Sequence, residues 1–177
     1  MLRKKTKTKT KTYQKIIILL VLSCAVHFLY DWFGFEWLTL FAPTGESLFQ
    51  HMRIFFTVYL LYSLFEYNFI YKTVGYWMSR FLLLTLIPWV MAMIYLLPQS
   101  FTGKIPTEIL EVFWSVSSTV LVWLVIVPLE KDLEKVKYSQ NAKLIISLLA
   151  ILIFLTSLVF TFNLPVYDIF AEPVTLY

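Results

Sequence analysis

The sequence predicts an all-α integral membrane bundle of five transmembrane helices, and three observations lead to this fold class. The chain of 177 residues is 59% hydrophobic and 15% charged, with a mean hydropathy of +0.74, which excludes an ordinary water-soluble domain. Five apolar runs each have about the 20 residues that a helix needs to cross a bilayer. The runs are long and continuous instead of short and alternating, which favours helices over a barrel.

The chain divides into two tails and one apolar domain. Residues 1–15 are predicted to be a basic, disordered cytoplasmic tail, residues 16–164 the five-helix transmembrane domain, and residues 165–177 an extracytoplasmic tail. The five predicted spans are residues 16–35, 52–71, 81–99, 109–129 and 144–164. An odd number of spans puts the two termini on opposite sides of the membrane.

The basic residues predict the orientation. Thirteen of the fifteen Lys and Arg residues fall on the N-terminal side of the predicted threading, and only Arg53 and Lys104 fall on the other. Because cytoplasmic segments carry the excess of positive charge, the N-terminus is predicted to be cytoplasmic, in a multi-pass protein of the cell membrane. The basic tail suits anionic lipid, and no folded basic module accompanies it, so nucleic acid is not expected as a partner.

Prolines and the single cysteine refine the spans. Pro88 lies inside the third span and predicts a kink, because proline removes one helical hydrogen bond. Four other prolines are predicted to mark segment ends: Pro98, Pro106, Pro128 and Pro165. Cys24 has no partner for an intramolecular disulfide. The apolar run continues past Cys24, which favours an uncleaved first helix over a lipoprotein signal peptide.

A narrow polar strip lies near the outer end of the first span. His27, Tyr30 and Asp31 stand at positions i, i+3 and i+4, so they share one helix face, and Cys24 extends that face one turn inward. Ionisable groups are expensive in lipid and mark either a functional site or a structural pair. The strip is therefore predicted to face protein or water.

The segment FAPTGESLFQHMR, residues 41–53, joins the first two spans. Pro43 and Gly45 predict a turn, Thr44 is the predicted N-cap of the second helix, and Glu46 then falls in its first turn. The threading places this turn outside, beside the polar strip of the first span.

The second helix continues the polar line. Ser47 and His51 stand at i and i+4, and Phe55, Tyr62 and Glu66 lie within about a quarter turn of His51. Glu66 is the deepest acid in the predicted threading. At the start of the fourth span Glu111 contributes a further carboxylate to the outer side.

Four of these residues could converge on a divalent metal such as zinc: His27, Asp31, Glu46 and His51. Glu111 or Tyr30 could assist in proton transfer. The spacing matches no diagnostic motif, and each residue also has a structural explanation. His27 and Asp31 could form an interfacial pair, Glu46 could only cap its helix, and Glu66 could pair with Lys72 or a tyrosine hydroxyl.

The two polar stretches also carry a resemblance. HFLYDWFG and FAPTGESLFQHMR resemble an uncharacterised family of small bacterial multi-pass membrane proteins with an Ala-Pro-x-x-Glu-Ser-x-x-x-His-x-Lys-like motif. The matching residues cover about the first third of the chain; they are His27, Tyr30, Asp31, Trp32, Ala42, Pro43, Glu46, Ser47 and His51. Arg53 stands where the family tends to have Lys, and Gln50 where it often has Glu. The resemblance implies the fold class and a bacterial origin, and it implies no activity.

Three functions remain open from the sequence. The favoured one is a binding or accessory subunit whose polar pocket engages a ligand, an ion or a membrane protein partner without chemistry of its own. The alternatives are a membrane-embedded metal-dependent hydrolase and a small transporter component in which Glu66 carries a proton. The distance between the His27 and His51 rings is the most informative single measurement, because below about 6 Å they could share one metal ion.

Overall fold

The computed structural model describes residues 11–69, 75–103, 105 and 107–163, so most of the predicted N-terminal tail and all of the C-terminal tail lie outside it. Lys72, Pro106 and Pro165 also lie outside the described residues. The elements are α1 (Thr12–Phe33), η1 (Glu36–Leu40), α2 (Leu48–Phe69), α3 (Tyr76–Thr102), α4 (Glu108–Leu133) and α5 (Gln140–Phe162). All five α-helices are long and apolar enough to cross a membrane, which confirms the predicted fold class. The inside and outside assignment stays a prediction.

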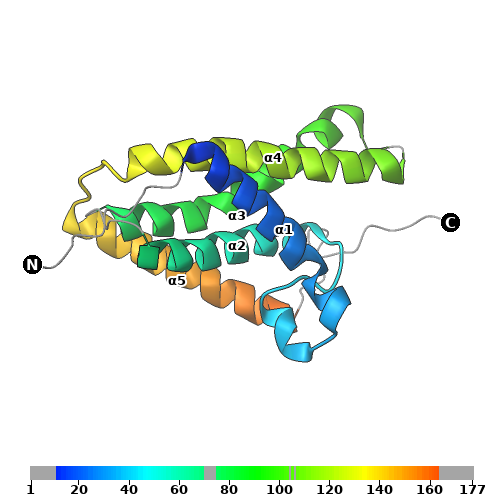
Figure 1. Ribbon diagram of the computed structural model, residues 1–177, viewed down its shortest axis with the longest axis horizontal. Coiled ribbons are helices and arrows are strands. Elements are labelled where there is room, and N and C mark those ends of the chain that lie inside the picture. Colours follow the sequence, from blue (N-terminus) through cyan, green and yellow to red (C-terminus); the bar gives the residue numbers. More distant parts are fainter. Residues whose placement is uncertain (1–10, 70–74, 104, 106, 164–177) are drawn as a thin grey trace, which may run out of the picture.

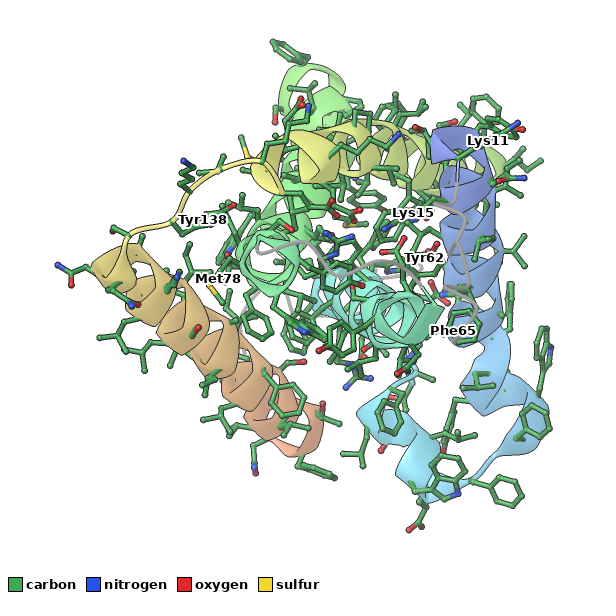
Figure 2. The ribbon with its side chains drawn as sticks, turned by 60° about the vertical axis from the view of Figure 1, so that its left-hand side comes forward. Lys11, Lys15, Tyr62, Phe65, Met78 and Tyr138 are labelled. Atoms are coloured by element: carbon green, nitrogen blue, oxygen red, sulfur yellow. The ribbon has the colours of Figure 1, made fainter. Side chains whose placement is uncertain are left out.

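Helices α2 and α3 form the centre of the bundle. Figure 2 looks nearly along them and shows α1, α4 and α5 arranged around the pair. In α2, 61% of the most apolar window is buried inside the protein, against 11% in α5, which packs along α3 on the outside. The large apolar side chains on the outer helices therefore face the bilayer, where no burial in protein is needed.

Two prolines do not end helices as the sequence predicts. Pro98 lies inside α3 and Pro128 inside α4, so these helices run several residues beyond the predicted spans. Each proline removes only one helical hydrogen bond, and a transmembrane helix tolerates this loss where neighbouring groups compensate. The first connection also contains the short 3-10 helix η1, which the sequence pattern does not predict.

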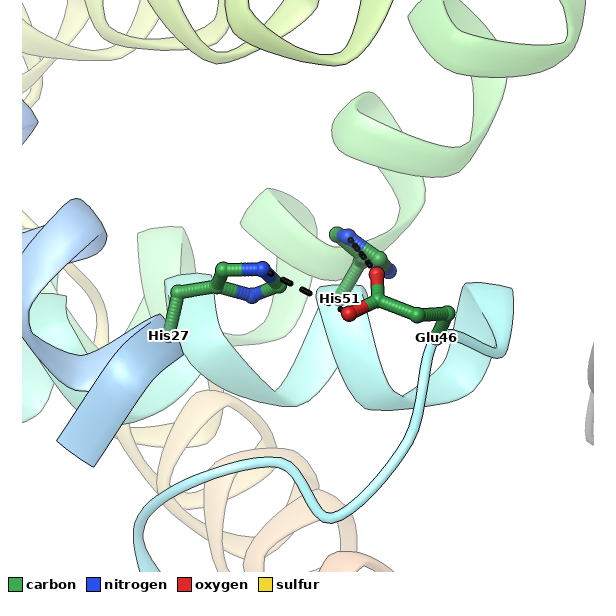
Figure 3. Close-up of side chains that lie close together, drawn as sticks. All are labelled: His27, Glu46 and His51. Carbon is green, nitrogen blue, oxygen red and sulfur yellow. Dashed lines mark ion pairs between the residues drawn. The ribbon is translucent and has the colours of Figure 1, made fainter. Parts of the chain in front are cut away.

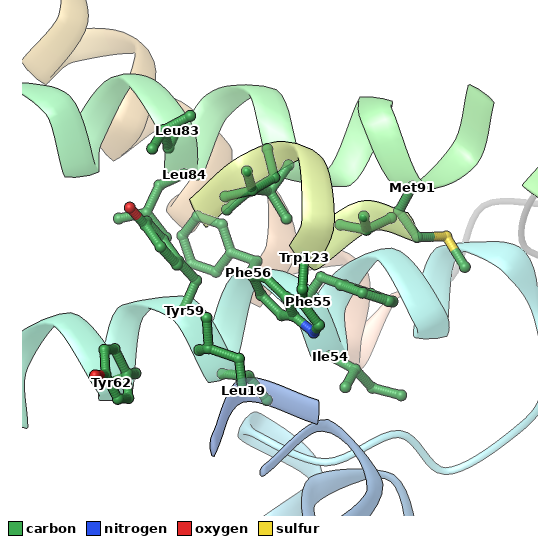
Figure 4. Close-up of a cluster of buried hydrophobic side chains, with 14 of the residues drawn as sticks. Leu19, Ile54, Phe55, Phe56, Tyr59, Tyr62, Leu83, Leu84, Met91 and Trp123 are labelled. Carbon is green, nitrogen blue, oxygen red and sulfur yellow. The ribbon is translucent and has the colours of Figure 1, made fainter. Parts of the chain in front are cut away.

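A layer of aromatic side chains fills the middle of the bundle. Trp123 of α4 is fully buried, stacks beside Phe55 and Tyr59 of α2 with ring centroids 5.3 and 6.2 Å away, and donates its indole N–H to Ser23 Oγ at 3.1 Å. Figure 4 shows these rings packed with apolar side chains of α3. This layer separates the polar groups at one end of the bundle from those at the other.

Helices α1 and α4 meet at one end and part at the other. Near the start of α1, the side chains of Thr12 and Lys15 are hydrogen-bonded to Lys131 and Glu130 of α4. Figure 1 shows α1 beginning against α4 and running obliquely away toward η1. The space between the two helices therefore widens toward the end that carries His27.

The start of α5 provides a test of the local structure. Ser139 is the N-cap, and its hydroxyl accepts a hydrogen bond from the Ala142 N–H at 3.2 Å. We expect Ser139→Ala to lower the free energy of unfolding by about 1 kcal/mol, because one N–H of the first turn loses its partner. Ser139→Asp preserves an acceptor and should keep the wild-type value. Denaturant titration in detergent micelles measures both, and equal stability of the two variants would contradict the cap.

Candidate metal site

Three side chains from separate parts of the chain meet at the wide end of the bundle. Glu46 lies in the connection before α2, His27 comes from the last third of α1, and His51 from the first turn of α2. Figure 3 shows the carboxylate of Glu46 close to both imidazoles, with an ion pair to each. His27 Nε2 lies 3.6 Å from Glu46 Oε1, and His51 Nε2 lies 3.5 Å from Glu46 Oε2. One ligand atom from each residue lies within 4.8 Å of the other two.

The loop before α2 explains how Glu46 reaches this position. The helix begins at Leu48, and the Ser47 hydroxyl accepts the Gln50 N–H at 3.4 Å. The prediction that Thr44 caps the helix, with Glu46 in its first turn, is therefore wrong. Thr44 instead accepts a hydrogen bond from the Gln50 amide at 3.4 Å. Glu46 precedes the helix, so its side chain can cross the gap between α1 and α2.

A hydrogen bond to the backbone orients His51. Its Nδ1 lies 3.2 Å from the carbonyl oxygen of Ser47, and a carbonyl can only accept, so Nδ1 carries the proton in this contact. In the neutral ring the other nitrogen, Nε2, then has its lone pair directed toward Glu46. Metal-binding histidines are commonly fixed by such a bond on the nitrogen that does not bind the metal.

The separations fit a shared metal ion. The centroids of the His27 and His51 rings lie 5.4 Å apart, below the distance of about 6 Å at which the two rings could share one metal ion. Two ligands bound to one zinc ion at about 2.1 Å lie about 3.4 Å apart in a tetrahedron. The nitrogen to oxygen distances of 3.5 and 3.6 Å, each to a different oxygen of Glu46, are close to that value and longer than the roughly 2.9 Å of an ordinary hydrogen bond. The three ligand atoms lie within 4.8 Å of one another, so the side chains would draw together around a bound ion.

The three side chains form one end of a cavity of about 520 Å³ between α1, α2, α3 and α4. Tyr95 of α3 lines it, and its ring lies parallel to the His51 ring with centroids 6.4 Å apart. The Tyr95 hydroxyl donates to Glu111 Oε1 at 3.2 Å, and Glu111 lines the same cavity from α4. The volume falls within the range of small-molecule pockets, so the site has room for a ligand besides a metal ion.

Two other predicted site residues, Asp31 and Tyr30, do not join this group, whereas Ser47 supports it. Asp31 is exposed near the end of α1 and does not belong to the three-residue cluster. Tyr30 is half-buried, and its carbonyl oxygen accepts the Gly34 N–H at 2.8 Å at the end of α1. Ser47 is buried and contributes through its backbone carbonyl and its capping hydroxyl.

Arg53 has a role that the sequence does not predict. It is 3% exposed and donates from one guanidinium nitrogen to the Ala42 carbonyl and from another to Thr161 Oγ1, each at 2.5 Å. These bonds attach the loop that carries Glu46 to α2 and α5. Arg53 therefore fixes the loop instead of serving only as a flanking charge.

Glu66 lies in a different cluster at the opposite end of the bundle. Its Oε2 accepts hydrogen bonds from Lys15 Nζ at 2.8 Å and from an Arg80 nitrogen at 2.9 Å. The same two cations bind Glu130 Oε1 at 2.7 and 2.8 Å, and Arg80 also pairs with Glu134. We call these five residues the ionic cluster; they are Lys15, Glu66, Arg80, Glu130 and Glu134.

The ionic cluster joins four helices through buried charges. Lys15 is 4% exposed, Glu66 5% and Arg80 1%, and they come from α1, α2 and α3. Tyrosine hydroxyls complete the cluster, since Tyr59 donates to Glu130 Oε2 at 2.6 Å and Tyr76 lies 3.4 Å from Glu66 Oε2. The predicted tyrosine partner of Glu66 is thus present, while the predicted continuity with His51 is interrupted by the aromatic layer.

Comparison of the chain with models of protein families, with curated proteins and with solved structures found no match. The geometry of the cavity and its polar groups is therefore the basis for a functional proposal. The structure itself indicates a multi-pass membrane protein with a cluster of two His and one Glu at one end of its helices.

Proposed function

We propose that this protein binds one divalent transition metal ion, with zinc as the best fit, through His27, Glu46 and His51. The observation that carries the proposal is the convergence of two imidazoles and one carboxylate, with ligand atoms within 4.8 Å of one another. The Ser47 carbonyl supports it by orienting His51 with Nε2 toward the centre of the group.

The ligand types select among metals. Imidazole nitrogen with one carboxylate suits zinc and other late first-row metals, whereas magnesium and calcium prefer shells of oxygen. Three protein ligands leave the fourth position of a tetrahedral zinc ion for water or a substrate oxygen, as in catalytic zinc sites. This is a metal-centred form of the binding role that the sequence favours.

A metal-dependent hydrolase is the second candidate, favoured by the position of Glu111. The Glu111 carboxylate and the Tyr95 hydroxyl line the same cavity as the three ligands, so an acid or base and a metal-bound water could act on one substrate. In that reaction Glu111 would accept a proton from the water, and the metal would polarise the substrate carbonyl or phosphoryl oxygen.

A proton-coupled transporter has less support. The Glu66 carboxylate is held by Lys15 and Arg80, and the aromatic layer around Trp123 lies between it and His51. About 22 Å of helix separates His51 from Glu66 at 1.5 Å per residue. A proton pathway between them would have to cross this packed layer.

Metal content tests the proposal directly. We expect the purified full chain, prepared with a tag that contains no histidine, to bind one equivalent of Co²⁺ with the visible absorption of a tetrahedral site and to exchange it for Zn²⁺. The double variant H27A/H51A should bind none, since these are the chain's two histidines. Glu36→Gln, at an exposed carboxylate on η1, is the control and should bind like the wild type. Absence of stoichiometric binding by the wild type would overturn the proposal.

A further inference from the structure

The cavity beside the metal site extends from the wide end of the bundle toward its middle. Its α1 lining runs from Phe28 back to Leu20, and its α4 lining runs from Glu111 to Thr119. Each of these stretches covers about 12 Å at 1.5 Å per residue, close to the depth of about 15 Å of one bilayer leaflet. Leu20 lies about 12 Å from the start of α1, so the inner end of the cavity approaches the centre of the membrane.

The polarity of the lining changes along this length. The ionisable groups gather at the outer end, where His27, Glu46 and His51 face Glu111 and Tyr95. At the inner end the lining is hydrocarbon from residues such as Leu20 and Phe55, together with hydroxyls that already have partners. Thr119 Oγ1 donates to the Ser115 carbonyl at 2.9 Å, and Ser23 Oγ donates to the Leu19 carbonyl at 2.8 Å.

Cavity-lining residues on both α1 and α4 are exposed: Phe28 is 45% exposed, Val112 65% and Val116 58%. The wall of the cavity is therefore open along these two helices. Since both helices cross the membrane, this open wall meets lipid. The two helices are in contact where Lys15 binds Glu130 and where Trp123 binds Ser23, and from there α1 runs obliquely away from α4 (Figure 1). This divergence leaves the opening.

We propose that one acyl chain of a membrane lipid enters this cavity from the side, with the polar head of that lipid at the metal site. The position of the head group rests on the proposed metal site, whereas the position of the chain depends only on the cavity. An empty cavity would forfeit dispersion contacts along its wall, and water near the centre of the bilayer would find few polar partners, since the hydroxyl protons of Ser23 and Thr119 are already donated to carbonyls. Lipid chains are as apolar as the lining, so entry of a chain costs little desolvation.

The polar end selects the head group. An oxygen of an ester, a carboxylate or a phosphate could occupy the fourth position on the metal, and the Tyr95 and Glu111 pair lies in the same cavity to contact hydroxyl or amine groups. The ligand class is therefore an amphipathic lipid. If the protein is a hydrolase, the same argument gives the class of its substrate.

Photocrosslinking tests the position of the chain. The protein would be reconstituted in vesicles of phosphatidylcholine and phosphatidylglycerol that contain a phospholipid with a diazirine midway along one acyl chain. We expect labelled peptides from residues 20–28 of α1 and 111–119 of α4. Thr119→Trp should fill the inner cavity and lower this labelling by about tenfold.

Ser117→Trp is the matched control. Ser117 lies two residues away on α4, makes the same kind of hydroxyl bond to the fourth preceding carbonyl, at 2.8 Å to Phe113, and does not line the cavity. It should leave the labelling unchanged, and both variants should bind Co²⁺ like the wild type. Equal labelling in the two variants would overturn the inference, because it would reflect general contact with lipid.

The single cysteine gives a measurement without a cavity-filling substitution. Cys24 is exposed and lines the cavity, so a fluorophore attached to it reports on the open wall. We expect lipids with a nitroxide midway along the chain to quench this fluorophore more strongly than iodide in water, and the reverse order would overturn the inference. The two proposals can fail separately. If the wild type shows cavity labelling but binds no metal, only the metal site is rejected. If it binds metal but shows no cavity labelling, only the lipid is rejected.

Discussion

Arg80→Ala is expected to lower the free energy of unfolding by about 3–5 kcal/mol, the cost of leaving buried charges without their partner. Arg80 is 1% exposed and binds Glu66 and Glu130 at 2.9 and 2.8 Å, as well as Glu134. Without it, Lys15 would be left to pair with both Glu66 and Glu130, and Glu134 would lose its ion pair with Arg80. The guanidinium also covers the Tyr76 ring, with 3.8 Å from its carbon to the ring centroid, so the variant loses packing as well.

Lys135→Ala provides the control for this prediction. Lys135 pairs with Asp132 at 2.7 Å, but both side chains are about three-quarters exposed, so the variant should have no measurable effect. Reversible unfolding in mixed micelles, followed by tryptophan fluorescence, measures both variants. Arg80→Lys should fall between Arg80→Ala and the wild type, because it keeps the charge but loses the planar fork that reaches several carboxylates. Equal stability of Arg80→Ala and Lys135→Ala would show that the ionic cluster does not hold the helices together.

The five helices could be predicted because hydrophobic length is a local property of the sequence. Each span needs only enough consecutive apolar residues, and every predicted span overlaps one helix. The C-terminal ends of α3 and α4 could not be predicted from the positions of prolines alone. Pro98 and Pro128 continue their helices because the loss of one hydrogen bond is smaller than the cost of unwinding helix within the membrane.

The meeting of His27 and His51 could be predicted from topology, since a short connection brings the ends of consecutive helices together. The position of Glu46 depended on where α2 begins. Capping by Ser47 instead of Thr44 is a difference of three residues, and such boundaries are poorly determined by sequence. That difference places Glu46 close to both rings instead of in the first helical turn.

The sequence does not predict the ionic cluster, because two of its members match another pattern. Lys15 and Arg80 resemble the basic residues that flank cytoplasmic helix ends, yet both are buried against glutamates. The available signal was the presence of Glu66, Glu130 and Glu134 on the predicted cytoplasmic side, where most other charges are basic. Charge counting treats each residue alone, whereas pairing depends on which helices are neighbours.

Single replacements of the proposed ligands should weaken metal binding more than any other substitution near the site. Loss of a residue that only orients a metal ligand typically lowers affinity by about 10–100-fold, so loss of a ligand itself should exceed about 100-fold. This result is expected for His51→Ala and for His27→Ala. Glu46→Gln tests the carboxylate, because it preserves the shape of the side chain and removes its charge. Competition with a chromophoric chelator, in detergent at fixed pH, gives the affinities.

Asp31→Asn is the informative comparison, because the sequence pattern and the structure disagree about this residue. Its position at i+4 from His27 predicts a ligand, yet Asp31 is exposed and lies outside the cluster of His27, Glu46 and His51. If the structural arrangement is the binding site, Asp31→Asn should change the affinity less than twofold, within the error expected for a surface group. A loss as large as that of His51→Ala would instead make Asp31 a ligand, and α1 would then have to present both residues to the metal from a single helical face.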